Sequence, residues 1–149
     1  MLGVPSVSAQ RNKPLMPGLK LPRALVAQLL SEAQGSPSAE VCGLMSARDG
    51  EPVRLYPVPN ISPTPERLFR MDPKAQIDAM RRMRDAGETL FAIYHSHPQG
   101  PATPSAEDLA QAAYPEALYL IVSLQAPEAA QLRAFWLRGG QAEPVELQI

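Results

Sequence analysis

LFAIYHSHPQGPATPSAED, residues 90–108, joins an apolar run to a polar loop and the start of a helix. Its first part, Leu90 to His97, is apolar on both faces, which is typical of a strand buried in the middle of a sheet. The loop Pro98 to Pro104 follows, and Ser105 to about Tyr114 reads as a helix that stops near Pro115. The stretch therefore predicts a central strand whose carboxyl end is followed by a loop and a helix.

The rest of the chain alternates helices with strands and ends in strands that pair as hairpins. The further helices expected are Arg23 to Gln34 and Asp72 to about Ala86, the second with Asp72 as cap and Pro73 at its first position. The further strands expected are Lys20 to Pro22, Glu40 to Ser46, Val53 to Val58, Ala117 to Leu124, Leu132 to Leu137 and Val145 to Ile149. We therefore expect an α/β (α+β) fold with a mixed β-sheet flanked by helices.

Length and composition indicate one domain of ordinary size. The chain has 149 residues, of which 45% are hydrophobic and 19% charged, as in globular rather than disordered proteins. Residues 1–18 mix Ser, Gln, Asn and Pro without a period, so we expect them to form a flexible N-terminal tail. Residues 19–149 then form the single domain.

Charge, cysteine content and apolar runs exclude several classes of protein. A net charge of -1 provides no basic field to hold nucleic acid. The single cysteine, Cys42, excludes an internal disulfide framework and a cysteine-rich zinc cluster. The longest apolar run, Leu118 to Val122, is too short to span a bilayer, and no secretory signal is visible. We therefore expect a cytoplasmic protein that binds neither nucleic acid nor a membrane.

Both histidines of the chain lie in one tripeptide, His95-Ser96-His97. In an extended chain, residues two apart point to the same side, so the two imidazoles converge where the strand ends. Converging imidazoles make a platform for zinc or iron. They are equally compatible with a pair of hydrogen-bonded histidines on a loop, so the tripeptide alone leaves both interpretations open.

Ser105 and Asp108 add a carboxylate at a suitable spacing. Seven residues separate His97 from Ser105, and positions three apart share one face of a helix. Asp108 would complete a site with three protein ligands and one position for water. Ser-x-x-Asp is also the pattern of a helix capping box, unless Thr103 caps the helix and frees both residues.

Glu40 is the remaining candidate, although a lone glutamate at a strand entrance is usually solvated. Water activated by a metal needs a base that takes its proton, and both histidines are already used. Cys42, two residues further on, is expected to be a small buried core residue. Zinc deaminases need paired cysteines, and the helical His-Glu-x-x-His motif is absent, whereas an iron site of two histidines and one carboxylate stays chemically possible.

In this order and spacing, Glu40, His95, His97, Ser105 and Asp108 resemble the motif of the JAMM (MPN-plus) zinc metallopeptidase family. Further similarity covers Glu-x-Cys-Gly-Leu at residues 40–44, Tyr-His-Ser-His-Pro at residues 94–98 and the strand at residues 118–124. The similarity extends over roughly Leu19 to Leu137. It implies an MPN/JAB-like (cytidine-deaminase-like) three-layer sandwich.

The resemblance also implies a role for each residue of the motif. His95, His97 and Asp108 would bind one Zn²⁺, with a water molecule as nucleophile. Glu40 would act as general base and then general acid, and Ser105 would donate a hydrogen bond to the oxyanion. Because inactive relatives lack some of these residues and this chain retains all five, an active enzyme is favoured.

The size of the chain narrows the substrate that the resemblance implies. Large members that cleave ubiquitin chains carry insertions, and 149 residues leave little room for them. The compact form resembles prokaryotic members that cleave after the C-terminal Gly-Gly of a ubiquitin-like or sulfur-carrier protein. The loops Asn60 to Pro65 and Pro98 to Pro104 are candidate walls of the cleft. The alternatives are a non-catalytic MPN-type interaction module and a JAB-fold hydrolase that acts on another substrate.

Overall fold

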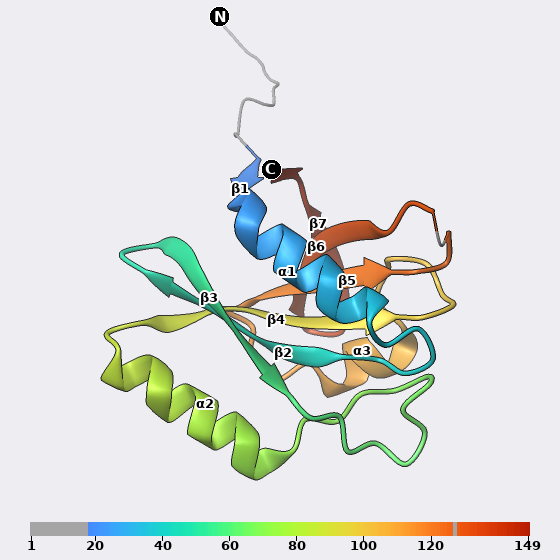
Figure 1. Ribbon diagram of the computed structural model, residues 1–149, viewed down its shortest axis with the longest axis horizontal. Helices are drawn as coiled ribbons and strands as arrows, with labels where there is room; N and C mark the ends of the chain where they lie inside the picture. Colours follow the sequence, from blue (N-terminus) through green and yellow to red (C-terminus); the bar gives the residue numbers. More distant parts are fainter. Residues whose placement is uncertain (1–17, 127) are drawn as a thin grey trace, which may run out of the picture.

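A six-stranded mixed sheet forms the centre of the molecule in the computed structural model, which describes residues 18–126 and 128–149 (Figure 1). Most of the expected N-terminal tail, residues 1–17, lies outside the described residues. The helices are α1 (Arg23–Gln34), α2 (Pro73–Asp85) and α3 (Ala106–Gln111). The strands are β1 (Leu19–Lys20), β2 (Cys42–Arg48), β3 (Glu51–Val58), β4 (Thr89–His97), β5 (Leu118–Ser123), β6 (Gln131–Arg138), β7 (Gln141–Val145) and β8 (Leu147–Gln148).

The strand order places β4 in the interior of the sheet. The order is β3-β2-β4-β5-β6-β7, and β1 pairs with β8 in a separate two-stranded sheet. β4 and β5 run parallel, whereas the other neighbours in the six-stranded sheet run antiparallel. The connection between the parallel strands contains α3. Because β4 ends at His97, α3 begins close to the carboxyl end of β4. The expected central strand, loop and helix are confirmed.

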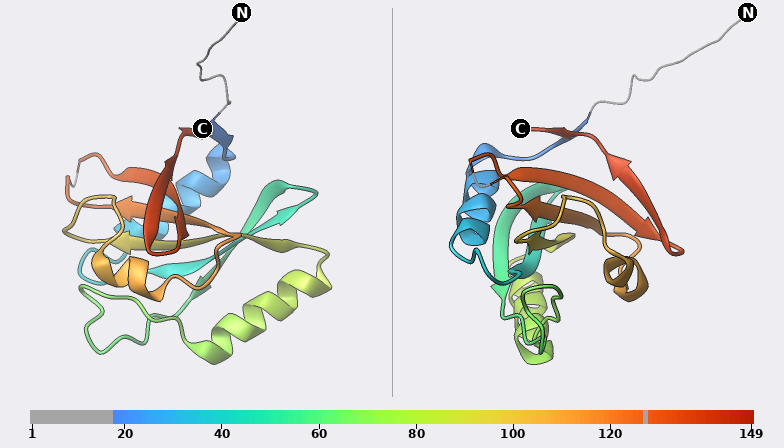
Figure 2. Two further views of the ribbon diagram at one scale, coloured as in Figure 1. Left: turned by 180° about the vertical axis from the view of Figure 1, so that it is seen from behind. Right: turned by 90° about the vertical axis from the view of Figure 1, so that its right-hand side faces the viewer.

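The helices cover the sheet from both sides, so the molecule has three layers (Figure 2). α1 packs on one face through Leu25, Leu29 and Ala33 against side chains such as Met45 and Leu120. α2 packs on the other face, where Ala79 and Met83 meet a second cluster of buried side chains, Leu44, Tyr56, Val58, Ile93, Tyr119, Ile121, Phe135 and Leu137. Successive residues of β2 and β4 belong to opposite clusters because side chains alternate along a strand. The three-layer arrangement agrees with the expected architecture.

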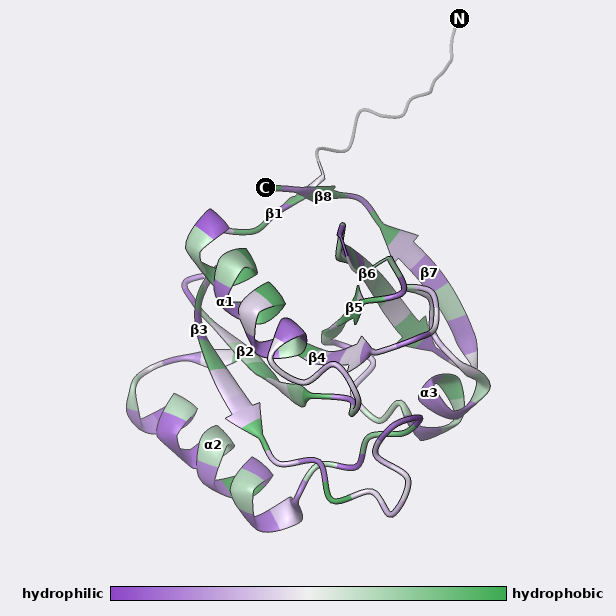
Figure 3. Ribbon diagram, turned by 45° about the vertical axis from the view of Figure 1, so that its right-hand side comes forward, coloured by the Kyte–Doolittle hydropathy of each residue, from purple (hydrophilic) through white to green (hydrophobic). Residues whose placement is uncertain are grey.

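Local sequence explains where α2 begins and why β5 is buried. The Asp72 side chain accepts a hydrogen bond from the Ala75 backbone N–H at 3.2 Å, and Pro73 occupies the first helical position. All six residues of β5 are buried. Figure 3 shows this strand mainly in green, while α2 alternates between purple and green. The expected cap at Asp72 and the expected proline at the first position of this helix are both confirmed.

Several predicted boundaries are wrong, and turns explain most of the differences. Gly139 and Gly140 have φ of 57° and 74°, which makes a tight hairpin in which Gln141 pairs directly with Arg138. The last hairpin strand is therefore Gln141–Val145 rather than Val145 to Ile149, and Leu147–Gln148 pairs with β1 instead. β1 begins one residue earlier than expected and ends two residues earlier, and α3 ends at Gln111 rather than near Tyr114.

Candidate metal centre

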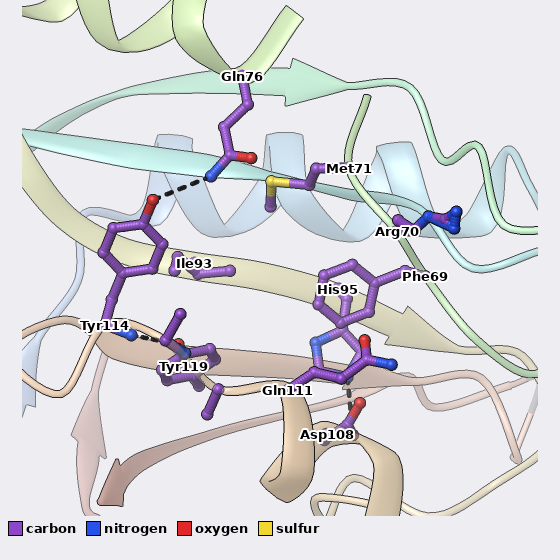
Figure 4. A pocket seen from close by; sticks show the side chains of 12 residues that line it. Phe69, Arg70, Met71, Gln76, Ile93, His95, Asp108, Gln111, Tyr114 and Tyr119 are labelled. Carbon is purple, nitrogen blue, oxygen red and sulfur yellow. Dashed lines mark hydrogen bonds and ion pairs between the residues drawn. The ribbon is translucent and has the colours of Figure 1, made fainter. Parts of the chain in front are cut away.

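Three ligand atoms of His95, His97 and Asp108 form a small triangle at the carboxyl end of β4. The two histidine Nε2 atoms lie 3.1 Å apart, and Asp108 Oδ2 lies 3.1 Å from that of His95 and 3.2 Å from that of His97. Both imidazoles come from one face of β4, and the carboxylate comes from the first turn of α3. Figure 4 shows His95 and Asp108 facing each other. The structure therefore brings together the three residues that were expected to share a site.

The size and chemistry of this triangle fit a zinc ion. Ligand atoms at 2.0–2.1 Å around a tetrahedral zinc are about 3.3 Å from one another. His97 Nδ1 lies 2.8 Å from the carbonyl oxygen of Pro101, which can only accept, so Nδ1 carries the proton and the lone pair of Nε2 faces the triangle. Two imidazole nitrogens and one carboxylate oxygen are a donor set of catalytic zinc sites.

Charges within the triangle favour the ligand forms of two of its residues. Burial lowers the pKa of His95, which keeps its imidazole neutral. Burial also raises the pKa of Asp108, but hydrogen bonds to His95 and His97 outweigh this and hold that pKa well below its usual range. For His97, burial lowers the pKa, while the contacts with Asp108 and Pro101 outweigh it, so the pKa is raised. Neutral His95 and ionised Asp108 are the forms that bind metal.

Ser105 caps α3, and Asp108 belongs to the same capping box. Ser105 Oγ accepts from the Asp108 N–H at 3.0 Å, and Asp108 Oδ2 accepts from the Ser105 N–H at 2.9 Å. The alternative in which Thr103 caps the helix is therefore wrong. Capping and the metal triangle do not compete, because the oxygen that accepts from Ser105 is the one that faces both imidazoles. The Ser105 hydroxyl keeps its hydrogen for another acceptor.

Glu40 is buried beside the triangle, although a lone glutamate at a strand entrance is usually solvated. It is 5% exposed, and its carboxylate lies within 4.8 Å of ring nitrogens of both histidines. Burial raises its pKa to about 7, with His97 lowering it and Asp108 raising it. Glu40 Oε1 has no hydrogen-bond partner among the described residues. A buried carboxylate that takes up a proton near neutral pH is suited to acid–base chemistry.

Glu40 precedes β2 instead of beginning it, which corrects the predicted strand. The Glu40 N–H donates to the Pro65 carbonyl at 2.7 Å, and its own carbonyl accepts from Asn60 Nδ2 at 3.0 Å. The next residue, Val41, exchanges hydrogen bonds with Ser96, at 2.9 Å to Oγ and 3.0 Å from the backbone N–H. The main chain at Glu40 is thus held by a loop and by the residue between the two histidines.

Two pockets open on either side of the two histidines. The first, about 290 Å³, contains His95 and Asp108 and has walls that include Phe69, Ile93 and Tyr119 (Figure 4). The second, about 570 Å³, contains Glu40, His97 and Ser105, together with residues 66–67 and 98–101. The loop at residues 98–104 is therefore a cleft wall, as expected. The expected wall at residues 60–65 is wrong, because residues 66–67 and 69–71, which follow it, line the pockets instead.

Several residues that support the site were not identified as functional residues from the sequence. Phe69 stacks on the His95 ring, with ring centroids 4.4 Å apart and an angle of 24° between the planes. Ser96, Asn60 and Pro101 act through the hydrogen bonds described above. The only available signal was their proximity in sequence to the motif, which applies to Ser96 and Pro101 but not to Asn60 or Phe69.

Cys42 takes no part in the metal centre. It is fully buried, and its Sγ lies 3.4 Å from the Val58 carbonyl oxygen as a weak donor. Burial raises the pKa of its thiol to about 12, which keeps it protonated and unsuited to bind metal. The expectation of a small buried core residue is confirmed. In residues 18–126 and 128–149, no helix has the length and apolar character needed to cross a membrane.

The sequence matches the family described as prokaryotic homologs of the JAB domain over residues 22–138. A probable TtuB-protein conjugate cleaving protease of Thermus thermophilus is 35% identical over 123 residues, 83% of this chain and 78% of that protein. A CysO-cysteine peptidase of Mycobacterium bovis is 33% identical over 127 residues, 83% of this chain and 86% of that protein. A desampylase of Haloferax volcanii is 36% identical over 93 residues, 61% of this chain and 67% of that protein.

Solved structures of similar chains have the same fold. A protein from Desulfitobacterium hafniense superposes with a TM-score of 0.78 at 34% identity, over 87% of this chain and 91% of that one. A JAB1/MPN domain protein from Archaeoglobus fulgidus superposes with a TM-score of 0.60 at 22% identity, over 89% and 97%. The expected resemblance, the mixed-sheet fold and the expectation of an enzyme that hydrolyses peptide or isopeptide bonds are confirmed. The chain belongs to the family of prokaryotic homologs of the JAB domain.

Proposed function

We propose that this chain is a zinc-dependent peptidase and isopeptidase that cleaves the amide bond after the C-terminal Gly-Gly of a ubiquitin-like or sulfur-carrier protein. The observation that carries the proposal is the triangle of His95, His97 and Asp108 beside buried Glu40. The names of the relatives, which cleave TtuB conjugates or a CysO–cysteine bond, support this substrate class. The cytoplasm is the compartment in which we place the activity.

His95, His97 and Asp108 would hold the zinc ion. When bound, zinc polarises the carbonyl of the scissile amide and lowers the pKa of a water molecule. Pro101 supports this arrangement because its carbonyl fixes the tautomer of His97. The Ser105 N–H supports it because it holds the Asp108 carboxylate toward the imidazoles.

Glu40 and Ser105 would move and stabilise charge during hydrolysis. Ionised Glu40 accepts a proton from the attacking water and then donates it to the leaving amine. Burial raises the pKa of Glu40 to about 7, so the carboxyl can both take and give that proton near neutral pH. The Ser105 hydroxyl donates to the oxyanion that develops on the scissile carbonyl.

The two pockets suggest how a substrate would lie across the centre. Because Glu40 delivers the proton to the leaving amine, the leaving group belongs in the pocket of about 570 Å³ that Glu40 and Ser105 line. The tail of the carrier protein would then occupy the other pocket. Apolar walls at Phe69, Ile93 and Tyr119 fit the side chain of a residue that precedes Gly-Gly.

The test measures zinc content and cleavage in the same preparation. The substrate is a ubiquitin-like carrier whose Gly-Gly end is extended by a short peptide or joined to a lysine side chain. We expect one zinc per chain and cleavage after Gly-Gly that stops when a chelator is added. Zinc-free protein, or cleavage that continues with the chelator, would contradict the proposal.

Glu40→Gln tests the role of the base. We expect this variant to retain zinc and to lose about 100- to 10,000-fold of the cleavage rate, the range typical of a general base. Glu51→Gln, which changes an exposed carboxylate at the start of β3, is the matched control and should cleave at the wild-type rate. Cleavage by Glu40→Gln at the wild-type rate would exclude Glu40 as the base.

A further inference from the structure

We propose that Asn60 is a positioning residue that holds both the Glu40 main chain and, through Phe69, the ring of His95. Asn60 lies 20 residues after Glu40 and 35 before His95, and lines neither pocket beside the histidines. The inference rests on the proposed function only for its effect on catalysis. Its effect on the geometry of the centre is independent of the substrate.

The Asn60 amide uses its full hydrogen-bonding capacity on four different residues. Nδ2 donates to the carbonyl oxygens of Glu40 and Leu68, each at 3.0 Å. Oδ1 accepts from the N–H of Ser62 at 3.0 Å and from that of Arg70 at 2.9 Å. An amide has two donor hydrogens and two acceptor lone pairs, so each is satisfied by a main-chain group. This one side chain therefore joins Glu40 to the loop at residues 60–71.

One of these four bonds fixes the main chain of Glu40, the proposed general base. Glu40 lies outside β2, so ladder hydrogen bonds do not hold its main chain. Its carbonyl is held by Asn60, and its N–H is held by Pro65, which belongs to the loop that Asn60 closes. Main-chain bonds from the Ile61 N–H to the Arg70 carbonyl at 2.8 Å and from the Asp72 N–H to the Pro59 carbonyl at 3.0 Å also close the base of this loop. Loss of the Asn60 amide would free the Glu40 carbonyl directly and would loosen, within the loop, the residue that holds the Glu40 N–H.

Two of the other bonds fix the residue that packs on His95. Asn60 bonds the main chain on either side of Phe69, at Leu68 and Arg70. The Phe69 ring stacks on the His95 imidazole (Figure 4). Among the described residues, the buried Nδ1 of His95 has no hydrogen-bond partner, whereas Nδ1 of His97 is fixed by Pro101. Nε2 of His95 faces Asp108, whereas no hydrogen bond within the described part of the chain holds the Nδ1 side of the ring, so stacking on Phe69 is what adds to the hold on the ring.

Two variants separate the bonds that Asn60 makes. Asn60→Ala removes all four, and Asn60→Asp keeps an oxygen acceptor for Ser62 and Arg70 but loses both donors to carbonyl oxygens. Asp72→Ala is the matched control, because Asp72 also makes a side-chain hydrogen bond in this region, to Ala75, but none to Glu40. If Asn60→Ala fails to fold, Asn60→Asp decides the question.

Amide hydrogen exchange and zinc affinity test the placement without any substrate. In Asn60→Ala we expect faster exchange at the Glu40, Ser62 and Arg70 amides and about tenfold weaker zinc binding, the smaller effect typical of a residue behind a ligand. In Asn60→Asp we expect faster exchange at Glu40 with Ser62 and Arg70 still protected. Asp72→Ala should change neither these amides nor zinc binding.

Steady-state cleavage tests the consequence for the reaction. We expect kcat to fall about 100-fold in both Asn60 variants, because a displacement of about 1 Å at a reacting group has an effect of this size, while KM changes far less. Unchanged exchange at Glu40, or a fall in kcat no larger than in Asp72→Ala at an equal loss of melting temperature, would overturn the inference. Absence of wild-type cleavage would reject the proposed function, and the exchange and zinc measurements would still decide the role of Asn60.

Discussion

The burial of Glu40 suits this residue to its proposed role in proton transfer but lowers the stability of the fold at neutral pH. Its carboxyl is 5% exposed, and burial raises its pKa to about 7. In the unfolded chain the same group has a pKa of about 4.3. Folding of the metal-free protein therefore takes up a proton between these values, and stability falls as the pH rises through that window. A residue that is buried so that it can exchange a proton weakens the fold at neutral pH.

Glu40→Gln should therefore stabilise the metal-free protein at pH 8 but not at pH 4. The neutral amide avoids the cost of a buried charge, which is at most about 4 kcal/mol for a pKa that moves to about 7. At pH 4 the carboxyl is protonated in the folded protein, and the advantage disappears. Thermal unfolding in the presence of a chelator measures the difference, and an equal difference at both pH values would contradict it.

At the scale of the elements, contact between β2 and β4 depends on Gly43. The Tyr94 side chain crosses this position and donates from its hydroxyl to Glu32 Oε1 on α1 at 2.7 Å. A Cβ at Gly43 would overlap the Tyr94 hydroxyl and ring and would also press on the Tyr56 carbonyl. The glycine lets the tyrosine of β4 reach across β2 to α1, next to the strand end that carries His95.

We expect Gly43→Ala to destabilise the protein by about 1–3 kcal/mol, the usual effect of overpacking a core. Tyr94 must leave its position or the strands must separate, and either change breaks its hydrogen bond to Glu32. Gly35→Ala is the control, since its nearest contact would be an ordinary 3.4 Å and its φ is -73°. Chemical unfolding of both variants provides the measurement. Equal stabilities of the two would show that Tyr94 moves without cost.

Elements with local signals could be predicted from the sequence, whereas those set by distant contacts could not. Asp72-Pro73 marks the start of α2 because cap and proline act within one turn. The spacing of His95, His97 and Asp108 is equally local and predicts their convergence. The burial of Glu40 depends on Asn60 and Pro65, which lie 20 and 25 residues further along the chain, and no period or spacing in the sequence reports these contacts.

At the scale of the whole molecule, the candidate metal centre links parts that lie far apart in the chain. Glu40 precedes β2, the imidazoles end β4, and the Asp108 carboxylate lies in the first turn of α3. The loop at residues 60–71 covers them from a fourth position. A ligand that holds the three atoms of the triangle therefore stabilises the tertiary arrangement rather than one element.

Chelation should accordingly lower the melting temperature of the zinc-loaded protein. Free zinc at 1,000 times its dissociation constant contributes about 4 kcal/mol, which corresponds to roughly 10 °C for a domain of this size. His95→Ala, which lacks one ligand, should melt at the same temperature with and without the chelator. Calorimetry measures both proteins. A wild-type melting temperature that ignores the chelator would exclude zinc as a contributor to the fold.

The capping box of α3 has a consequence for the order of that helix. α3 has six residues, none of them buried, and isolated helices of this length do not persist in water. Its first turn is held by Ser105 and Asp108, and Asp108 Oδ2 is shared with the two imidazoles. Winding of α3 and occupancy of the triangle are therefore linked equilibria. Zinc binding and formation of α3 therefore stabilise each other by the same free energy. The helical content of residues 106–111 should then report whether zinc is bound.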